Sequence, residues 1–215
     1  MPGTIGIPTG EFTRFAQFGQ SLAALHYPPQ TYCVWTTGGN IARNFNRIVA
    51  QMRDEWVWFI GDDHAFHPDI LTRLLEHQVD VVVPLCAQRT PPYSYGVYDW
   101  PDEQGVAPLI PLDHRTGLVP VAVCGSAGML VRRYVFDKLD QPYFRLGTMV
   151  ADAEGEDIDF CKRVHDAGFH IYVDTDTALG HSTVVTAWPQ RTENGTYGTK
   201  LDLGNERHFI FRVGE

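Results

Sequence analysis

Two adjacent carboxylates and an imidazole follow an apolar stretch in the first half of the chain. Asp62, Asp63 and His64 come directly after Trp56–Ile60, whose nearly continuous apolar character predicts a buried strand. Strand ends of this kind form the ligand-binding edge of an α/β sheet. Neighbouring carboxylates repel each other there unless a cation is present. Oxygen ligands suit Mg²⁺ or Mn²⁺, and the added imidazole favours Mn²⁺. The residues alone also allow a polar loop in which one aspartate caps a turn.

A second acidic pair opens a predicted helix in the second half. Glu156 and Asp157 precede Ile158–Ala167, a segment with helical apolar spacing that Gly168 is expected to end. Acidic residues in a first turn interact favourably with the helix dipole, by about 0.3–1 kcal/mol, so capping alone would explain the pair. A buried carboxylate with a raised pKa can also act as a general base, and the two roles are compatible.

The acidic stretch carries a resemblance to a known family. Phe59–Leu71, with the sequence FIGDDHAFHPDIL, resembles the DxD region of GT-A glycosyltransferases, especially family-2-like enzymes. The resemblance implies that Asp63 binds the metal directly, that Asp62 contacts the ribose or the metal's waters, and that His64 is a further metal candidate. The first aspartate of the family pattern falls on Gly61. This leaves two interpretations, a reduced Gly-Asp-Asp motif or an Asp-Asp-His variant.

Later segments extend the resemblance to about four-fifths of the chain. The segment that contains Glu156 and Asp157 is similar to the family's ED motif, which implies that Asp157 accepts the proton of the attacking hydroxyl in an inverting enzyme. His181 follows Leu-Gly after a strand-like run, and the similar family pattern implies that it completes the metal site, although a lone histidine is more often structural. The chain has no Q-x-x-R-W motif, which argues against a processive polysaccharide synthase.

The resemblance also implies where substrates bind. The donor would be a UDP- or GDP-linked sugar, and the acceptor a saccharide or another molecule with a free hydroxyl. The expected donor-binding residues are Pro8, Thr9, Gly10, Glu11, Thr37, Arg43, Asn44 and Asp62. The expected acceptor-binding residues are Gly125 and Ser126, which the resemblance implies, and Tyr143 and Tyr93, whose rings could stack on a sugar. From the residues alone, turn chemistry and ordinary aromatic packing are alternative explanations for these positions.

Strand-like and helix-like segments alternate along the chain, which predicts an α/β fold. The resemblance makes this a GT-A, Rossmann-like sheet, mixed but mostly parallel, with helices on both faces. We expect one domain over residues 1–215, with a nucleotide-binding half at about 1–90, an acceptor and catalytic half at about 91–182, and a lid and C-terminal tail at 183–215. The predicted strands are Thr4–Pro8, Tyr32–Thr36, Trp56–Ile60, Val79–Val83, Val119–Val123 and Phe169–Val173. The predicted helices are Glu11–Leu25, a helix capped by Asn40, a helix opened by Pro68, Arg132–Leu139 and Ile158–Ala167.

Composition excludes several classes of protein. The 215 residues are 44% hydrophobic and 20% charged, as in a globular domain. The formal net charge of -9 argues against general nucleic-acid binding, which needs a basic face. No apolar run approaches the ~18 residues of a membrane span, and the N-terminus lacks a signal-peptide pattern. Four widely spaced cysteines without a CxxC motif predict free thiols and a cytoplasmic location.

Other functions remain open at this point. A retaining GT-A transferase would share the metal site. A nucleotidyltransferase would usually carry a basic, glycine-rich phosphate loop, whereas Gly3–Glu11 has no Lys or Arg. A non-catalytic module that binds nucleotide sugars is supported by Gly61 in the acidic motif. A hydrolase using Asp62 and Asp63 would leave the second acidic pair and His181 unexplained.

Overall fold

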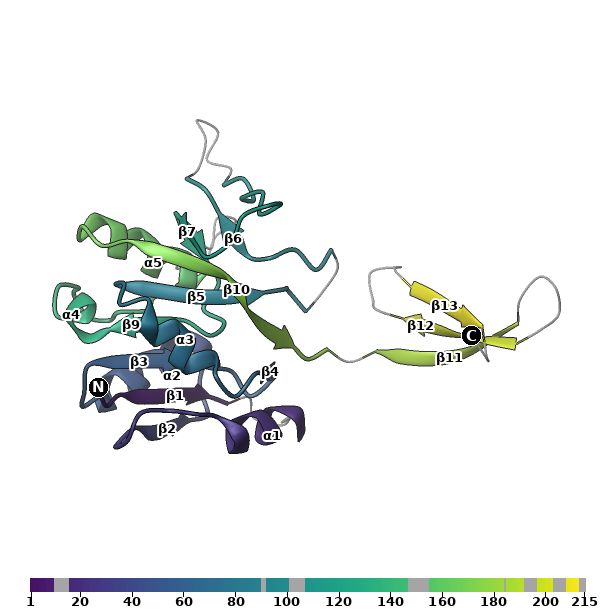
Figure 1. Ribbon diagram of the computed structural model, residues 1–215, viewed down its shortest axis with the longest axis horizontal. Helices are drawn as coiled ribbons and strands as arrows, with labels where there is room; N and C mark the ends of the chain where they lie inside the picture. Colours follow the sequence, from purple (N-terminus) through teal and green to yellow (C-terminus); the bar gives the residue numbers. More distant parts are fainter. Residues whose placement is uncertain are drawn as a thin grey trace.

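The structure is a computed structural model that describes residues 1–9, 16–89, 92–100, 107–146, 155–183, 185–191, 197–202 and 208–212. A twisted central sheet forms the body of the molecule, and a smaller C-terminal sheet stands apart from it (Figure 1). In the central sheet the order of neighbouring strands is β2 (Tyr32–Thr36), β1 (Thr4–Pro8), β3 (Trp56–Phe59), β9 (Leu130–Arg132), β5 (Val81–Cys86), β10 (Ile171–His181) and β4 (His64–Phe66), with β7 (Leu118–Val121) also paired to β10.

The central sheet is mixed, with most strands running in one direction. Strands β1, β2 and β3 are mutually parallel. Strand β9 runs antiparallel between β3 and β5, so β5 shares the direction of β3, and β10 is parallel to β5. Strands β4 and β7 both run antiparallel to β10. The carboxyl ends of β1, β3 and β5 therefore meet at one edge of the sheet.

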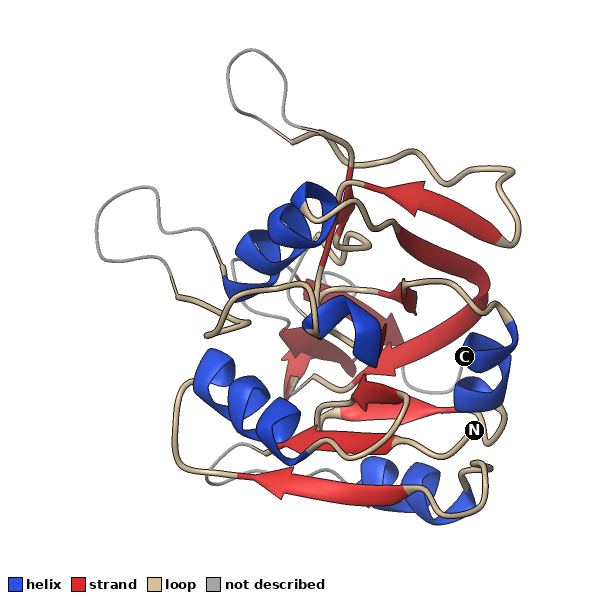
Figure 2. Cartoon of the chain, turned by 90° about the vertical axis from the view of Figure 1, so that its left-hand side faces the viewer, coloured by secondary structure: helices blue, strands red, loops and turns tan. Residues whose placement is uncertain are grey.

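Helices cover both faces of this sheet, as Figure 2 shows. One buried cluster joins α2 (Ile41–Gln51), α4 (Arg133–Phe136) and α5 (Glu156–Asp166) to one face, and the other joins α1 (Ala16–Ala24) and α3 (Ile70–Glu76) to the opposite face. Strand β3 serves both clusters, because Val57 and Phe59 point to the first and Trp56 and Trp58 to the second. This period of two is why a strand buried on both faces reads as a continuous apolar run.

Most predicted elements are confirmed, and the α/β class with them. The strands Thr4–Pro8 and Tyr32–Thr36 have the predicted bounds. The Oδ1 atom of Asn40 accepts the N–H of Arg43 at 2.8 Å and caps α2 as expected. The main error is β10, predicted to end at Val173 but continuing to His181. Its register on β5 shifts between Asp174 and Ala178, and polar residues in this irregular part hid the strand.

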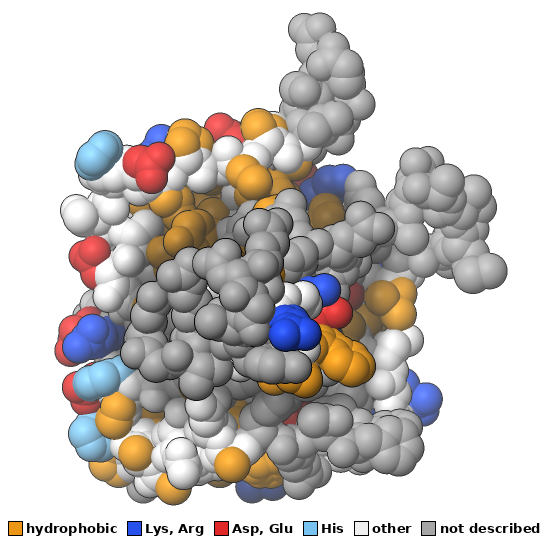
Figure 3. Space-filling model, turned by 90° about the vertical axis from the view of Figure 1, so that its right-hand side faces the viewer, with side chains coloured by type: hydrophobic (Ala, Val, Ile, Leu, Met, Phe, Trp, Pro, Cys, Tyr) orange, Lys and Arg blue, Asp and Glu red, His pale blue; other side chains and the backbone are white. Residues whose placement is uncertain are grey.

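Two smaller sheets complete the described fold. Strands β6 (Val97–Tyr98) and β8 (Val123–Cys124) form a short antiparallel pair. Strands β11 (Thr186–Arg191), β12 (Tyr197–Asp202) and β13 (His208–Arg212) form the C-terminal antiparallel sheet, in the region predicted as lid and tail. Among the described atoms of the face in Figure 3, acidic and basic side chains are interspersed. Among the helices of the described residues, none combines the length and the hydrophobicity that a membrane span requires.

Candidate active site

A cavity of about 930 Å³ opens where β1, β3 and β5 end. This volume is at the upper end of the range of small-molecule sites, about 300–1,000 Å³. Asp63, His181 and Asp157 all line it, so the three residues that the sequence assigned to metal and base face one space. Asp62 and His64 line it as well and are both buried.

Asp63 and His181 are in direct contact although 118 positions separate them. The Nε2 atom of His181 lies 3.2 Å from Oδ2 of Asp63, and Nδ1 of His181 lies 3.1 Å from the carbonyl oxygen of Ala87. The contact follows from the pairing of β4 with β10, which places His181 opposite His64. The N–H of Ser182 donates to the carbonyl oxygen of Asp63 at 2.8 Å and fixes the turn before β4.

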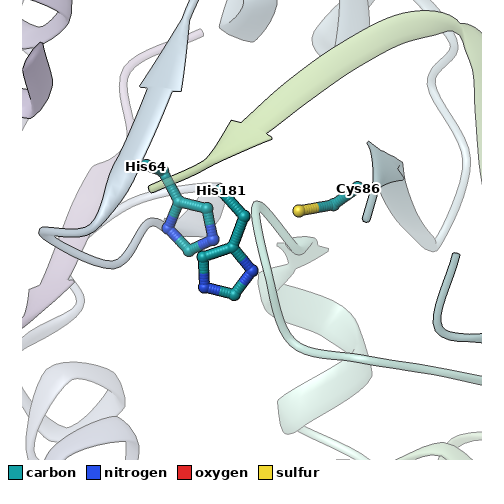
Figure 4. Close-up of side chains that lie close together, drawn as sticks. All are labelled: His64, Cys86 and His181. Atoms are coloured by element: carbon teal, nitrogen blue, oxygen red, sulfur yellow. The ribbon is translucent and has the colours of Figure 1, made fainter. Parts of the chain in front are cut away.

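His64 and Cys86 lie against the same pair. The rings of His64 and His181 stack at a centroid distance of 4.6 Å. The ligand atoms of His64, Cys86 and His181 all lie within 4.8 Å of one another, and Figure 4 shows the thiol beside the two rings. The Nδ1 atom of His64 contacts the carbonyl oxygen of Gly61 at 3.1 Å. Its Nε2 atom is buried and has no hydrogen-bond partner among the described residues.

The electrostatics of this cluster favour an ion pair. Hydrogen bonds to Asp63 and Cys86 raise the pKa of His181 to about 10. Burial would raise the pKa of Asp63, but the hydrogen bond to His181 and the charges of His64, His181 and Arg89 together hold it below its usual value. Burial lowers the pKa of His64. At neutral pH the protein therefore presents an ionised Asp63 with a neutral His64 ring beside it.

Asp157 lies in the first turn of α5 and lines the cavity beside Gly125. Its Oδ1 atom accepts the N–H of Ile158 at 2.9 Å. Its Oδ2 atom would lie 3.9 Å from a Cβ added to Gly125. Burial raises the pKa of Asp157 and also that of Glu156. Glu156 is not among the described residues that line the cavity, so of the two acids Asp157 is the one placed towards a substrate.

Of the predicted donor-binding residues, four line the cavity: Pro8, Thr9, Asn44 and Asp62. Thr9 is buried, and its hydroxyl donates to the carbonyl oxygen of Thr36 at 3.2 Å. Asn44 is 3% exposed, and its side-chain oxygen has no hydrogen-bond partner among the described residues. Thr37 and Arg43 are exposed and lie outside this lining. Gly10 and Glu11 lie outside the described residues.

On the predicted acceptor side, Gly125 and Ser126 line the cavity. Tyr143 does not, because its ring packs edge-on against Phe136 at 5.1 Å in the core. Tyr93 is also absent from the lining, whereas Tyr95 and, on strand β6, Tyr98 contribute to it.

Two residues at the cavity were not expected from the sequence. Cys86 ends β5 three residues beyond the predicted strand end. Arg89 follows shortly after, and its guanidinium donates to Oδ2 of Asp63 at 3.0 Å. The sequence signal that could have identified Arg89 is its position just past the carboxyl end of a central strand, where α/β sheets bind ligands. The prediction that all four cysteines are free is confirmed.

Comparison with known proteins gives a family and a fold. Residues 14–140, more than half of the chain, match the family model described as glycosyl transferase family 2. No curated protein matches the chain.

Among solved structures, A197 from STIV is similar at 15% identity and a TM-score of 0.54, covering 99% of this chain and 98% of A197. Two S. aureus TarS structures are also similar. TarS 1–349 in complex with UDP-GlcNAc has 15% identity and a TM-score of 0.56, covering 86% of this chain and 59% of the TarS chain. The other has 14% identity and a TM-score of 0.53, covering 86% of this chain and 37% of that chain.

Proposed function

The chain belongs to glycosyl transferase family 2, and from that premise we propose that it moves a sugar from a nucleotide-sugar donor to an acceptor hydroxyl in the cavity between Asp63 and Asp157. It is a glycosyltransferase with the GT-A fold. The observation that carries the proposal is that Asp63, His181 and Asp157 line one cavity of about 930 Å³.

The residues around Asp63 fit a divalent cation, which in the family's usual chemistry is Mn²⁺ or Mg²⁺ and whose identity at this site depends on the donor atoms. Asp63 supplies a carboxylate oxygen and His181 an imidazole nitrogen 3.2 Å away. The unpartnered Nε2 atom of His64 is a further nitrogen beside them. When bound, the cation would offset the charge that develops on the departing nucleoside diphosphate. Arg89, whose side chain is 60% exposed beside Asp63, adds a positive charge that can turn towards the same phosphates.

We place the nucleoside of the donor on the side formed by Pro8, Thr9 and Asn44. The unpartnered side-chain oxygen of Asn44 supports this placement, because a buried polar atom without a partner is costly unless a ligand satisfies it. UDP- and GDP-linked sugars are both candidates, and UDP-GlcNAc is the first donor to test because it is the ligand named for TarS.

Asp157 acts as the base in this proposal. It receives the proton of the acceptor hydroxyl while the hydroxyl oxygen attacks the anomeric carbon from the face opposite the leaving group. The raised pKa of Asp157 supports the role, since a carboxylate with a higher pKa is the stronger base. Gly125 leaves the space beside Oδ2 free of a side chain. The expected stereochemical outcome is inversion.

The test is a donor-turnover assay with Mn²⁺ and a panel of UDP- and GDP-linked sugars. We expect at least one donor to stabilise the protein against heating and to be turned over by the wild type. NMR assignment of the product anomer then decides the stereochemistry, and a retained configuration would rule out Asp157 as an in-line base. Donor binding without turnover under any condition would instead identify a non-catalytic binding module.

A further inference from the structure

We propose that Cys86 joins His64 and His181, beside the carboxylate of Asp63, as a sulfur ligand, so that this site binds Zn²⁺ and Co²⁺ in strong preference to Mg²⁺. The inference narrows the cation of the proposed function to a chemical class. It rests on that function only for the location of the site, because the donor atoms themselves argue for the metal.

The first argument is the composition of the donor set. Two imidazole nitrogens and one sulfur lie within 4.8 Å of one another, with one carboxylate of Asp63 beside them. Mg²⁺ requires oxygen ligands in near-octahedral geometry. Imidazole and thiolate ligands suit Zn²⁺, whereas carboxylate, carbonyl and water ligands suit Mg²⁺ and Mn²⁺. In the general affinity order of divalent metals Co²⁺ also lies above Mn²⁺.

The second argument is the orientation of both imidazoles. In His64 and in His181 the Nδ1 atom lies 3.1 Å from a backbone carbonyl oxygen, that of Gly61 and that of Ala87 respectively. Metal-binding histidines commonly donate one ring N–H to such an oxygen, which fixes the ring and directs the other nitrogen to the metal. Nε2 of His64 is buried without a hydrogen-bond partner among the described residues. A bound cation would satisfy its lone pair, which no described hydrogen-bond donor does.

The third argument is distance. Zinc bonds of about 2.0 Å to nitrogen and about 2.3 Å to sulfur, at tetrahedral angles, place donor atoms about 3.3–3.5 Å apart. The present separations of up to 4.8 Å therefore require side-chain shifts of roughly 1 Å. Cys86 and His181 sit on paired strands, since Leu179 is the partner of Cys86 in the β5–β10 ladder. The backbone thus holds the ligands near their bonding positions.

The experiment titrates Co²⁺ alone into the metal-free full chain and records its absorption spectrum. We expect a near-ultraviolet band from thiolate-to-cobalt charge transfer and intense visible bands typical of four-coordinate Co²⁺. Zn²⁺ should remove both bands at stoichiometric concentration, whereas Mg²⁺ in large excess should not.

Cys86→Ser should abolish the thiolate band and lower the affinity for Co²⁺ by at least about tenfold, because even changes in residues that only orient metal ligands cost 10–100-fold in metal affinity. Cys33→Ser, which alters an exposed cysteine on β2, should change neither.

A second measurement avoids dependence on the variant's folding. Zn²⁺ should protect Cys86 of the wild type from iodoacetamide, read by mass spectrometry, and leave the alkylation of Cys33 unchanged. Co²⁺ binding without a thiolate band, unprotected Cys86, or displacement of Co²⁺ by Mg²⁺ as readily as by Zn²⁺ would overturn the inference. None of these readouts uses a sugar donor, so failure here leaves the transferase proposal standing, and absence of turnover leaves the metal result standing.

Discussion

Asp157 and Gly125 face each other so closely that a Cβ added to the glycine would lie 3.9 Å from Oδ2 of the aspartate. The carboxylate and the glycine come from different parts of the fold, the first turn of α5 and the end of β8. Both residues line the cavity that also contains Asp63, so the acid is reachable from it. This relationship makes Asp157 the residue whose chemistry can be tested most directly.

Replacing Asp157 with Asn should lower kcat by about 10²–10⁴-fold, the usual contribution of a general base. Donor affinity should change little, because the amide keeps the size and shape of the carboxylate side chain. Steady-state kinetics with the best donor measure the effect. Asp159→Asn is the matched control, since it removes a carboxylate from the same helical turn, one that pairs with Arg163 at 3.7 Å. Equal losses in both variants would indicate a helix-dipole effect instead of base catalysis.

The pH dependence should reflect the burial of Asp157. A base works only when deprotonated, so kcat/KM should fall as the pH drops through the pKa of Asp157. Burial raises this pKa, which places the acidic limb above the value of about 3.9 for a free aspartate. A pH–rate profile checks this, and a limb at or below the free value contradicts it.

Burial of Asp157 also has a consequence for stability. An acid whose pKa is raised on folding destabilises the native state progressively as the pH rises from the unfolded pKa to the raised folded pKa, and fully above it. Asp157→Asn should therefore have a Tm at or above that of the wild type at pH 7, and the difference should close below about pH 3.9, where both the folded and unfolded carboxyl groups are protonated. Thermal unfolding at the two pH values measures it. A variant that is less stable at pH 7 would contradict the role of burial.

The sequence predicted the order of the elements better than their arrangement in the sheet. Apolar runs such as Trp56–Ile60 identify strands because burial on both faces leaves no polar alternation. The insertion of β9 between β3 and β5 depends on contacts distant in sequence, which no local pattern reports. Cys86 was missed for a related reason, because β5 extends three residues beyond its β-branched core only where β10 pairs with it.

The loop between β8 and β9 offers a test of packing near the cavity. Gly128 has φ +69°, and a Cβ there would lie 2.6 Å from Cγ of Pro84. Gly117 has φ +72°, but no atom lies within 4 Å of its added Cβ. Gly117→Ala should cost about 1 kcal/mol from backbone strain alone, and Gly128→Ala about 1–3 kcal/mol more from overpacking. Urea unfolding gives both values. Equal losses would show that Pro84 moves aside without cost.

Gly61 occupies the position where the family pattern carries an aspartate, and the structure gives a physical reason for glycine. A Cβ at this position would lie 2.8 Å from Oδ1 of Asp63 and 2.9 Å from Nδ1 of His64, both closer than nonbonded atoms allow. Gly61→Asp should therefore weaken cation binding despite restoring the family pattern, because Asp63 and His64 must leave their present positions. We expect a loss of at least about tenfold in Co²⁺ affinity, comparable to changes in groups that orient metal ligands.

Gly61→Ala separates steric from electrostatic effects at this position. It adds only the Cβ, so a loss similar to that of Gly61→Asp would mean that contact with Asp63 and His64 dominates. Both affinities come from Co²⁺ titration, and thermal unfolding of the metal-free variants shows whether the fold is intact. The opposite outcome, tighter cation binding in Gly61→Asp, would mean that the loop before β4 rearranges readily and that a third carboxylate is the stronger factor.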